Sequence, residues 1–362
     1  MIKAPEHIRT IKPYVPGKPI EELERELGIK NSIKLASNEN PIGPSPLALK
    51  AIKNRSNCLN SLNRYPDGSG YYLKNALAEK LSVKPEEIIL GNGSNELIDI
   101  AARTFMSPGD EAVMAYPSFV VYSMAVQAMG GRAIQVPLKD YKHDLNAMLD
   151  AVTPRTKMLF IANPNNPTGT MNTRTELDRL MSRVKDGILV VIDEAYYEYV
   201  TDPEYADSFK HFRNGKDILI LRTFSKIYGL AGLRIGYGIA RQDIITEMNK
   251  IRAPFNTNTI AQKAAIEALK DKTHVRLSQR INNNGKEYLY KELSSLGIKY
   301  VPTEANFIYM IMDKDSKTVY DALLKQGVIV RPMGPKELRV TIGLPEENKR
   351  FIGALKKSRV ES

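Results

Sequence analysis

The chain of 362 residues has one cysteine, four histidines and no tryptophan. Cys58 has no second cysteine to pair with, so an internal disulfide is excluded and a reducing compartment such as the cytoplasm is expected. His7, His143, His211 and His274 stand far apart, without the spacing that metal ligands show. The sequence therefore excludes a disulfide-stabilised fold and gives no support to a metal site.

Long apolar runs and long basic runs are also missing. No apolar stretch approaches the roughly 20 residues that a membrane-spanning helix needs, and residues 1–6 contain no apolar signal core. The net charge is +11, but the longest basic cluster is a pair such as Lys356-Lys357. Nucleic-acid binding needs basic residues gathered in a run or on one face. Neither a membrane nor a nucleic acid is therefore expected as a partner, and the positive charge is expected to attract small anions.

Between residues 32 and 260, short apolar runs alternate with amphipathic segments. The clearest runs are 112–115, 157–162, 187–192 and 217–221. Runs of this kind are typical of strands that are buried on both faces of a sheet. Their alternation with helical patterns predicts an α/β domain with a mostly parallel sheet flanked by helices.

The pattern changes after residue 260. Two long helical patterns cover 259–270 and 273–296. Three short apolar segments, expected to be strands, follow at 306–311, 328–330 and 338–342. Residues 1–31 form a proline-rich arm with one helix, and they are expected to join this part because chain termini often pack together. The expected division is a larger α/β domain over 32–260 and a smaller α+β domain made of 1–31 with 261–362.

In a parallel sheet, ligands bind beyond the carboxyl ends of the strands. Four polar motifs follow apolar runs of this chain, at 91–96 (GNGSNE), 163–169 (NPNNPTG), 193–196 (DEAY) and 223–226 (TFSK). A glycine-rich turn before a helix suits a phosphate, a buried carboxylate such as Asp193 needs a cation or a donor, and Lys226 beside hydroxyls suits a nucleophilic amine. Singly, each motif also has an ordinary explanation as a turn, a helix cap or an exposed lysine. Their order, one in each successive αβ unit, favours one shared site.

Together these motifs resemble those of the class I and II aminotransferases, which are pyridoxal-phosphate (PLP) enzymes of fold type I. The resemblance covers nearly the whole chain, and its most specific parts are 166–169 (NPTG) and Ser225-Lys226 with Arg234. The segment 13–19 (PYVPGKP) is similar to the subgroup that acts on histidinol phosphate. The resemblance implies amino transfer from glutamate, by way of PLP, to imidazole-acetol phosphate, which gives histidinol phosphate.

The resemblance also implies a role for each cofactor-binding residue. Lys226 forms the Schiff base with PLP and moves the proton, Asp193 keeps the pyridine nitrogen protonated, and Tyr196 donates to the ring hydroxyl O3′. The other implied contacts within the chain are Gly93, Ser94, Asn95, Phe119, Asn166, Thr223, Ser225 and Arg234. Tyr65 of the partner subunit reaches the cofactor phosphate, which implies a homodimer with shared active sites.

The implied substrate contacts are Tyr14, Asn38, Asn306, Arg331 and Arg339. Arg339 grips the substrate carboxylate as a two-pronged donor. Tyr14, Asn306 and Arg331 contact the phosphate or carboxylate of the substrate side chain. The segment between Arg331 and Arg339 is shorter than is usual in the family. A surface arginine in a strand therefore stays open as the alternative for Arg331.

Other functions on a similar scaffold also stay open. An aromatic amino-acid aminotransferase and a phosphothreonine decarboxylase share the same cofactor chemistry. A transcription regulator with an aminotransferase-like domain would need an added DNA-binding module, for which the 31 residues before the expected fold leave no room.

Overall fold

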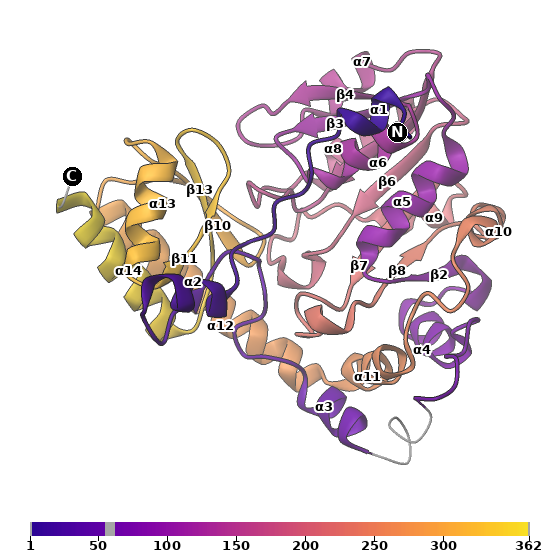
Figure 1. The fold of residues 1–362 in the computed structure, drawn as a ribbon. Coiled ribbons are helices and arrows are strands. Elements are labelled where there is room, and N and C mark those ends of the chain that lie inside the picture. Colours follow the sequence, from indigo (N-terminus) through magenta and orange to yellow (C-terminus); the bar gives the residue numbers. More distant parts are fainter. Residues whose placement is uncertain (1, 55–61, 361–362) are drawn as a thin grey trace.

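The computed structural model describes residues 2–54 and 62–360, so Cys58 lies outside the described residues. Two units lie side by side, a larger one built on a seven-stranded sheet and a smaller one built on a four-stranded sheet (Figure 1). Among the described residues, no helix is both long enough and apolar enough to cross a membrane.

The seven-stranded sheet has the strand order β2-β8-β7-β6-β5-β3-β4. Its strands are β2 (Ile88–Gly91), β3 (Glu111–Tyr116), β4 (Arg132–Pro137), β5 (Thr156–Ala162), β6 (Leu189–Asp193), β7 (Ile218–Thr223) and β8 (Gly236–Ile239). Neighbours from β4 to β7 pair in parallel, whereas β8 runs antiparallel to both β7 and β2. The prediction of a mostly parallel sheet is confirmed.

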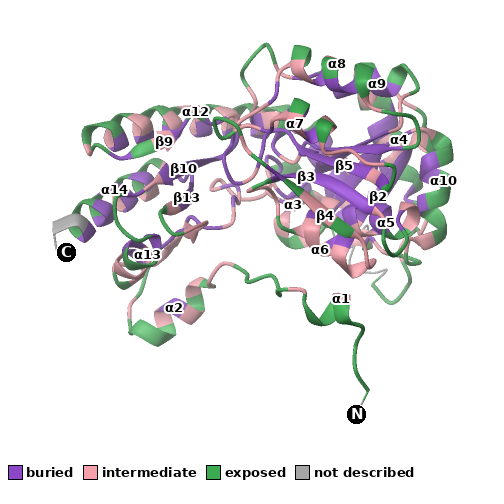
Figure 2. Ribbon diagram, turned by 90° about the horizontal axis from the view of Figure 1, so that it is seen from above, coloured by how far each residue is buried: buried purple, intermediate pink, exposed green. Residues whose placement is uncertain are grey.

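Helices cover both faces of this sheet, because its strands are apolar on both sides. In β6, for example, Val190 and Ile192 face one hydrophobic core, while Leu189 and Val191 face the other. The first core is covered by α3 (Pro46–Lys53), α4 (Tyr71–Leu81), α7 (Leu145–Asp150), α8 (Arg174–Arg183), α9 (Ser208–Arg213) and α11 (Thr259–Lys270). The second is covered by α5 (Ser94–Phe105), α6 (Val121–Ala128) and α10 (Gln242–Ile251). Figure 2 shows the buried strands between helices with exposed outer faces.

The smaller unit has its own core. Its antiparallel sheet has the order β12-β13-β10-β9, with β9 (Lys299–Val301), β10 (Phe307–Ile311), β12 (Arg331–Pro332) and β13 (Glu337–Thr341). A short parallel pair joins β1 (Ile33–Lys34) to β11 (Val328–Ile329). The helices α12 (Lys272–Ser295), α13 (Ser316–Lys325) and α14 (Pro345–Val360) pack on these strands. The larger unit also contains the single-turn helices η2 (Pro85–Glu87), η3 (Tyr197–Tyr199) and η4 (Ala231–Leu233).

The N-terminal arm contacts both units (Figure 1). Its first helix, α1 (Glu6–Arg9), lies beside α6 of the larger unit, where Gln127 Nε2 donates to Thr10 Oγ1 at 2.8 Å. Its second helix, α2 (Ile20–Leu27), packs Leu23 against Ile329 of the smaller unit. The arm between the two helices therefore crosses from one unit to the other.

The expected division at residue 260 falls at the start of α11, and this helix packs with α3 and α4 in the core of the larger unit. Its alanines Ala261, Ala264, Ala265 and Ala268 are fully buried there. By packing, the smaller unit begins with α12, whose C-terminal part contributes Leu289 and Leu293 to the smaller core.

Candidate active site

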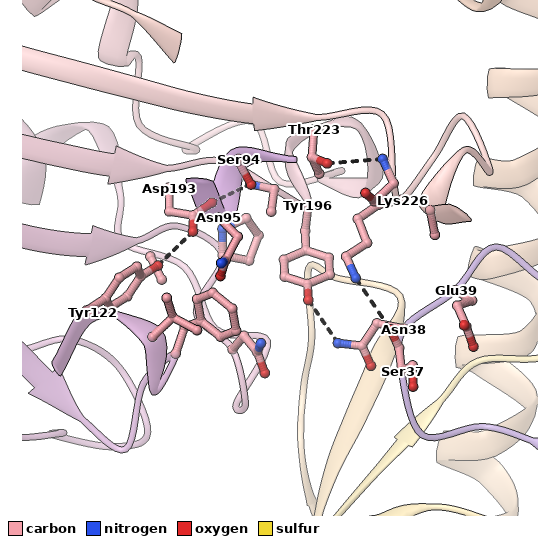
Figure 3. Close-up of a pocket in the computed structure, with 18 of the residues that line it drawn as sticks. Ser37, Asn38, Glu39, Ser94, Asn95, Tyr122, Asp193, Tyr196, Thr223 and Lys226 are labelled. Carbon is pink, nitrogen blue, oxygen red and sulfur yellow. Dashed lines mark hydrogen bonds between the residues drawn. The ribbon is translucent and has the colours of Figure 1, made fainter. Parts of the chain in front are cut away.

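A cavity of about 530 Å³ opens at the carboxyl edge of the seven-stranded sheet, between the two units. Its walls come from the ends of β5, β6 and β7, the start of α5, and β13 of the smaller unit (Figure 3). The predicted site residues that line it are Tyr14, Asn38, Ser94, Asn95, Phe119, Asn166, Asp193, Tyr196, Thr223, Ser225, Lys226, Arg234 and Arg339. Residues from the far ends of the sequence are thus brought into one cavity.

Asp193, the last residue of β6, is a buried carboxylate with two donors. The Tyr122 hydroxyl donates to Oδ2 at 2.8 Å, and the Ala195 amide donates to Oδ1 at 3.1 Å (Figure 3). Burial raises the pKa of Asp193 to about 6, although both hydrogen bonds favour the charged form. A buried carboxylate in this state is stabilised by a cation, so the site favours a positively charged group beside Asp193.

Lys226 follows β7, and its amine points into the cavity (Figure 3). Its Nζ donates to the Ser37 carbonyl across a long distance of 3.4 Å. Burial, with the nearby charge of Arg339, lowers the pKa of Lys226 to about 8, while Glu39 opposes the shift. An amine with this pKa is partly unprotonated near neutral pH and can act as a nucleophile or base.

A hydrogen-bonded network leaves two donors free to face the cavity. Tyr196 Oη accepts from Asn38 Nδ2 at 2.9 Å, so its own hydroxyl proton is available for another acceptor. Asn166 Oδ1 accepts from Arg339 Nη1, so its amide Nδ2 is left to donate. Thr341 Oγ1, which accepts from the Asn38 amide at 2.9 Å, holds Asn38 in place. The network therefore presents the Tyr196 and Asn166 donors from neighbouring strand ends.

The start of α5 forms an anion-binding end of the cavity. Its first backbone amides have no partner within the helix, as at any helix N-terminus, and Ser94 and Asn95 line the cavity there. Arg234 Nη1 donates to Ser225 Oγ at 3.3 Å, which places a cation and a hydroxyl beside these amides. Gly93 has φ +74°, and a Cβ at this position would lie 2.3 Å from Arg234 Nη2. Only glycine therefore lets the guanidinium approach the helix start.

Arg339 is the main cation at the opposite end of the cavity. Its side chain is buried, with Nη2 donating to the Ala36 carbonyl at 2.7 Å, and its Nε has no hydrogen-bond partner among the described residues. Burial lowers the pKa of Arg339, and the nearby charge of Arg331 lowers it further. A buried guanidinium with an unused donor suits a carboxylate or phosphate.

Four predicted residues lie outside the lining. Gly93 supports Arg234, and Asn306 is buried behind Asn38, whose carbonyl accepts from Asn306 Nδ2 at 3.0 Å. Arg331 Nη2 donates to the Val15 carbonyl at 2.6 Å, with its guanidinium 5.5 Å from the Tyr14 ring centre. Tyr65 lies away from the cavity, where it is 83% exposed and stacks on Phe255.

Sequence reasoning missed several polar contacts of the site. In the sequence, Tyr122 looks like an ordinary core residue of a helix. In the structure it is indeed fully buried and stacks on Phe160. Its position three residues after Phe119, which also lines the cavity, was a usable signal. Ser37 and Glu39 flank the predicted residue Asn38, so their segment was a usable signal, but only the fold shows that they lie beside Lys226.

The donor set fits a flat, phosphorylated ring. An anion site stands at the start of α5, a carboxylate at the end of β6, and an amine at the end of β7, with Phe119 on the cavity wall. The glycine requirement at Gly93 is the structural sign that the anion site is built for close approach. The same cavity keeps Arg339 available for a second, acidic molecule.

Known proteins resemble this chain over its full length. The family described as aminotransferase class I and II matches residues 30–355. A histidinol-phosphate aminotransferase from Moorella thermoacetica is 54% identical over 359 residues, which cover 98% of this chain and 92% of that protein. One from Caldicellulosiruptor saccharolyticus is 47% identical, with coverage of 97% and 98%. The crystal structure of histidinol-phosphate aminotransferase from Sinorhizobium meliloti in complex with pyridoxal-5′-phosphate is similar with a TM-score of 0.91 at 27% identity, covering 100% of this chain and 99% of that one.

Proposed function

Because the chain belongs to the class I and II aminotransferase family, we propose that it is a PLP-dependent histidinol-phosphate aminotransferase. The reaction moves an amino group from L-glutamate to imidazole-acetol phosphate and yields 2-oxoglutarate and L-histidinol phosphate. The observation that carries this proposal is the meeting of Lys226, Asp193 and an anion-binding helix start in one cavity of a chain that is 54% identical to a protein with that name.

PLP, when bound, supplies a carbonyl carbon that exchanges amines and a ring that draws electrons from the reacting carbon. Lys226 Nζ is the amine in the cavity that can attach to that carbonyl. In its unprotonated form it can also take a proton from the substrate Cα and return it, which its lowered pKa favours. Asp193 would hold the proton on the ring nitrogen, and Tyr122 keeps the carboxylate oriented.

The donors around the ring position are matched to its substituents. The phosphate would be held by Ser94, Asn95, Ser225 and Arg234. Thr223 supports Ser225, because its Oγ1 accepts a hydrogen bond from the Ser225 backbone amide at 3.1 Å. The free donors of Asn166 and Tyr196 would serve the ring oxygen, and Phe119 would lie against the ring.

Two different anions must use the substrate end of the cavity. Glutamate carries an α-carboxylate where histidinol phosphate carries a phosphooxymethyl group, so Arg339 must accept either one. A phosphate is larger and more highly charged than a carboxylate. Arg331, whose charge acts on Arg339 and whose side chain holds the arm beside Tyr14, is the second cation we assign to it. Asn38 lines the cavity, and Asn306 supports Asn38 from behind.

Homodimer formation is part of the proposal. The Tyr65–Phe255 stack, with ring centres 4.7 Å apart, leaves Phe255 45% exposed, and Tyr71 and Tyr72 are exposed nearby in the sequence. Exposed aromatic groups of this kind suit an interface with a second copy. In such a dimer, Tyr65 would reach the phosphate site of the other subunit.

The domain division and the compartment are also proposals. We place the smaller domain from α12 onward together with α2, since α11 packs in the larger core. A cytoplasmic location suits a chain with a single cysteine.

The proposed function is tested with a panel of amino donors and keto acceptors, followed by the absorbance of the bound cofactor. L-Glutamate and histidinol phosphate should both convert the cofactor to its amino form, and imidazole-acetol phosphate should convert it back. A preference for phenylalanine or tyrosine over histidinol phosphate would replace this function by an aromatic aminotransferase. Release of CO₂ from phosphothreonine without a keto acceptor would replace it by a decarboxylase. The variant Lys226→Ala serves as the inactive control.

A further inference from the structure

A second cavity, also of about 530 Å³, lies behind the active site. Strand alternation explains its position. Asp193 and Thr223 face the active-site cavity, whereas their chain neighbours Glu194 and Arg222 point to the opposite face of the sheet edge, where Arg222 lines the second cavity. The two cavities therefore share strand ends and stand back to back.

The floor of the second cavity is a rigid, neutralised ion pair. Arg222 donates to Glu194 from Nε at 2.8 Å and from Nη2 at 2.7 Å, and both side chains are buried. Tyr197 covers the guanidinium, with its ring centre 3.7 Å from Arg222 Cζ. Tyr205, Tyr228 and Leu269 add apolar wall. A flat or aliphatic group would be well covered here.

Glu198 supplies a carboxylate that no other described side chain pairs with. Its carboxylate lines the second cavity, and no hydrogen bond or ion pair from another described residue reaches it. Burial raises the pKa of Glu198 to about 7, although Arg222 and Lys80 oppose the shift. The amine of Lys80 is instead directed to the Tyr228 hydroxyl and the Leu269 carbonyl, each at 3.2 Å. A carboxylate placed in this way is best satisfied by a ligand ammonium group.

The rim carries the opposite charge. Lys272 and Arg276 lie one turn apart at the start of α12, are exposed, and form no ion pair within the described part of the chain. Asp202 also stands at the rim, where its Oδ1 already accepts from the Glu204 amide at 2.8 Å. A molecule that enters the cavity thus passes two free cations and ends at a free carboxylate.

We propose that the second cavity binds a small zwitterion, a free α-amino acid with an aromatic or aliphatic side chain, at a site separate from the active site. The ammonium group meets Glu198, the carboxylate meets Lys272 or Arg276, and the side chain lies between the tyrosines. The volume lies within the range of roughly 300–1,000 Å³ that is usual for small-molecule sites. No part of this assignment depends on which substrate the active site takes.

The position of the second cavity gives its ligand a means of affecting the active site. Its wall joins the larger unit to the first turns of α12, and the other end of α12 lies in the core of the smaller unit (Figure 1). A bound amino acid would therefore favour one relative position of the two units. It would also press on Tyr197, the chain neighbour of Tyr196.

The test measures binding of L-phenylalanine by isothermal titration to holoenzyme whose cofactor has been fixed by borohydride, so that no turnover occurs. 2-Phenylethylamine and 3-phenylpropionate, which each lack one of the two charges, are the matched probes. Wild-type protein should bind L-phenylalanine at least about 10-fold more tightly than either probe, as expected for a charged hydrogen bond. Glu198→Gln and Arg276→Glu should each weaken this binding about 10-fold or more.

Two controls separate the sites. Arg280→Glu changes an exposed cation one turn further along α12, outside the lining, and should leave binding unchanged. Arg339→Lys disturbs the active site and should also leave it unchanged. The proposal is overturned if Arg339→Lys abolishes binding while Arg276→Glu does not, because the ligand then occupies only the active site. Absence of binding to wild-type protein, or equal binding of all three probes, overturns it as well.

Discussion

At the scale of single residues, the surroundings of Lys226 predict an unusual reactivity. Burial and Arg339 lower the pKa of its amine to about 8, so it loses its proton well before an ordinary lysine, whose pKa is about 10.4. In cofactor-free protein, acylation of Lys226 should rise with pH and reach half its maximum near pH 8. Peptide mass spectrometry after brief labelling at a series of pH values measures this, with the exposed Lys317 as reference. A midpoint near pH 10 would contradict the prediction.

Tyr122 is the residue that sequence reasoning overlooked, and its hydroxyl is predicted to matter for turnover. Tyr122→Phe removes the donor to Asp193 Oδ2, which disfavours the charged carboxylate and raises the pKa of Asp193 further above its usual range. Loss of a hydrogen bond to a charged group costs about 1.5–3 kcal/mol, so kcat should fall roughly 10- to 150-fold. The acid limb of the kcat profile should move to higher pH, measured by steady-state rates. Tyr288→Phe, on the outer part of α12, is the control, and an unshifted acid limb in Tyr122→Phe would count against the role.

Arg331 is predicted to discriminate between the two substrates. Arg331→Ala removes the charge beside Arg339 and frees the arm at Val15. Binding of the phosphate of histidinol phosphate should therefore be weakened more than binding of the carboxylate of glutamate. A broken charged pair in a closed site costs about 2–5 kcal/mol, which corresponds to a loss of roughly 30- to several-thousand-fold in kcat/KM for histidinol phosphate. The two half-reactions are measured separately by stopped-flow absorbance. Equal losses for both substrates would assign Arg331 to the arm alone.

At the scale of elements, the start of α5 is predicted to depend on Gly93. In Gly93→Ala the new Cβ would lie 2.3 Å from Arg234 Nη2, so the guanidinium must leave the anion site, and PLP affinity should fall roughly 10- to 150-fold. Gly109→Ala is a matched control, because Gly109 also has a positive φ, +91°, but nothing lies within 4 Å of its Cβ. Both variants carry backbone strain, and only Gly93→Ala should lose cofactor, as measured by equilibrium dialysis.

The elements themselves were largely predictable, because their signals are local. The runs that became β3, β5, β6 and β7 are apolar on both faces, which is the local pattern of strands buried inside a parallel sheet. What α11 packs against was not predictable, since an amphipathic pattern says that one face is buried but not by which partner. The site residues at strand ends were predictable for the same reason as the strands. The contact of Tyr122 with Asp193 and the second cavity were not predictable, because each joins elements that only the folded chain brings together.

At the scale of the whole molecule, the proposed homodimer with shared sites predicts recovery of activity in mixed dimers. Lys226→Ala and Tyr65→Ala should each be severely impaired, the first through the amine and the second through the partner's phosphate site. If the subunits exchange freely, half of the dimers are hybrids and one of their two sites has both native residues. Activity should therefore recover to about a quarter of the wild-type value. No recovery after exchange has been verified by mass spectrometry would mean that each site is built from one chain.

The N-terminal arm sets a mechanical limit on the enzyme. Its contour from Thr10, held at Gln127, to Pro19, at the start of α2, contains nine peptide links, which reach roughly 32 Å when fully extended. Pro13, Pro16 and Pro19 stiffen this stretch, so little slack is stored in it. As long as both ends of the arm stay attached, the two units can separate only within the length of this arm. Any opening of the cavity by movement of the smaller unit would be bounded by this arm, and cutting the arm would remove that limit without touching a catalytic group.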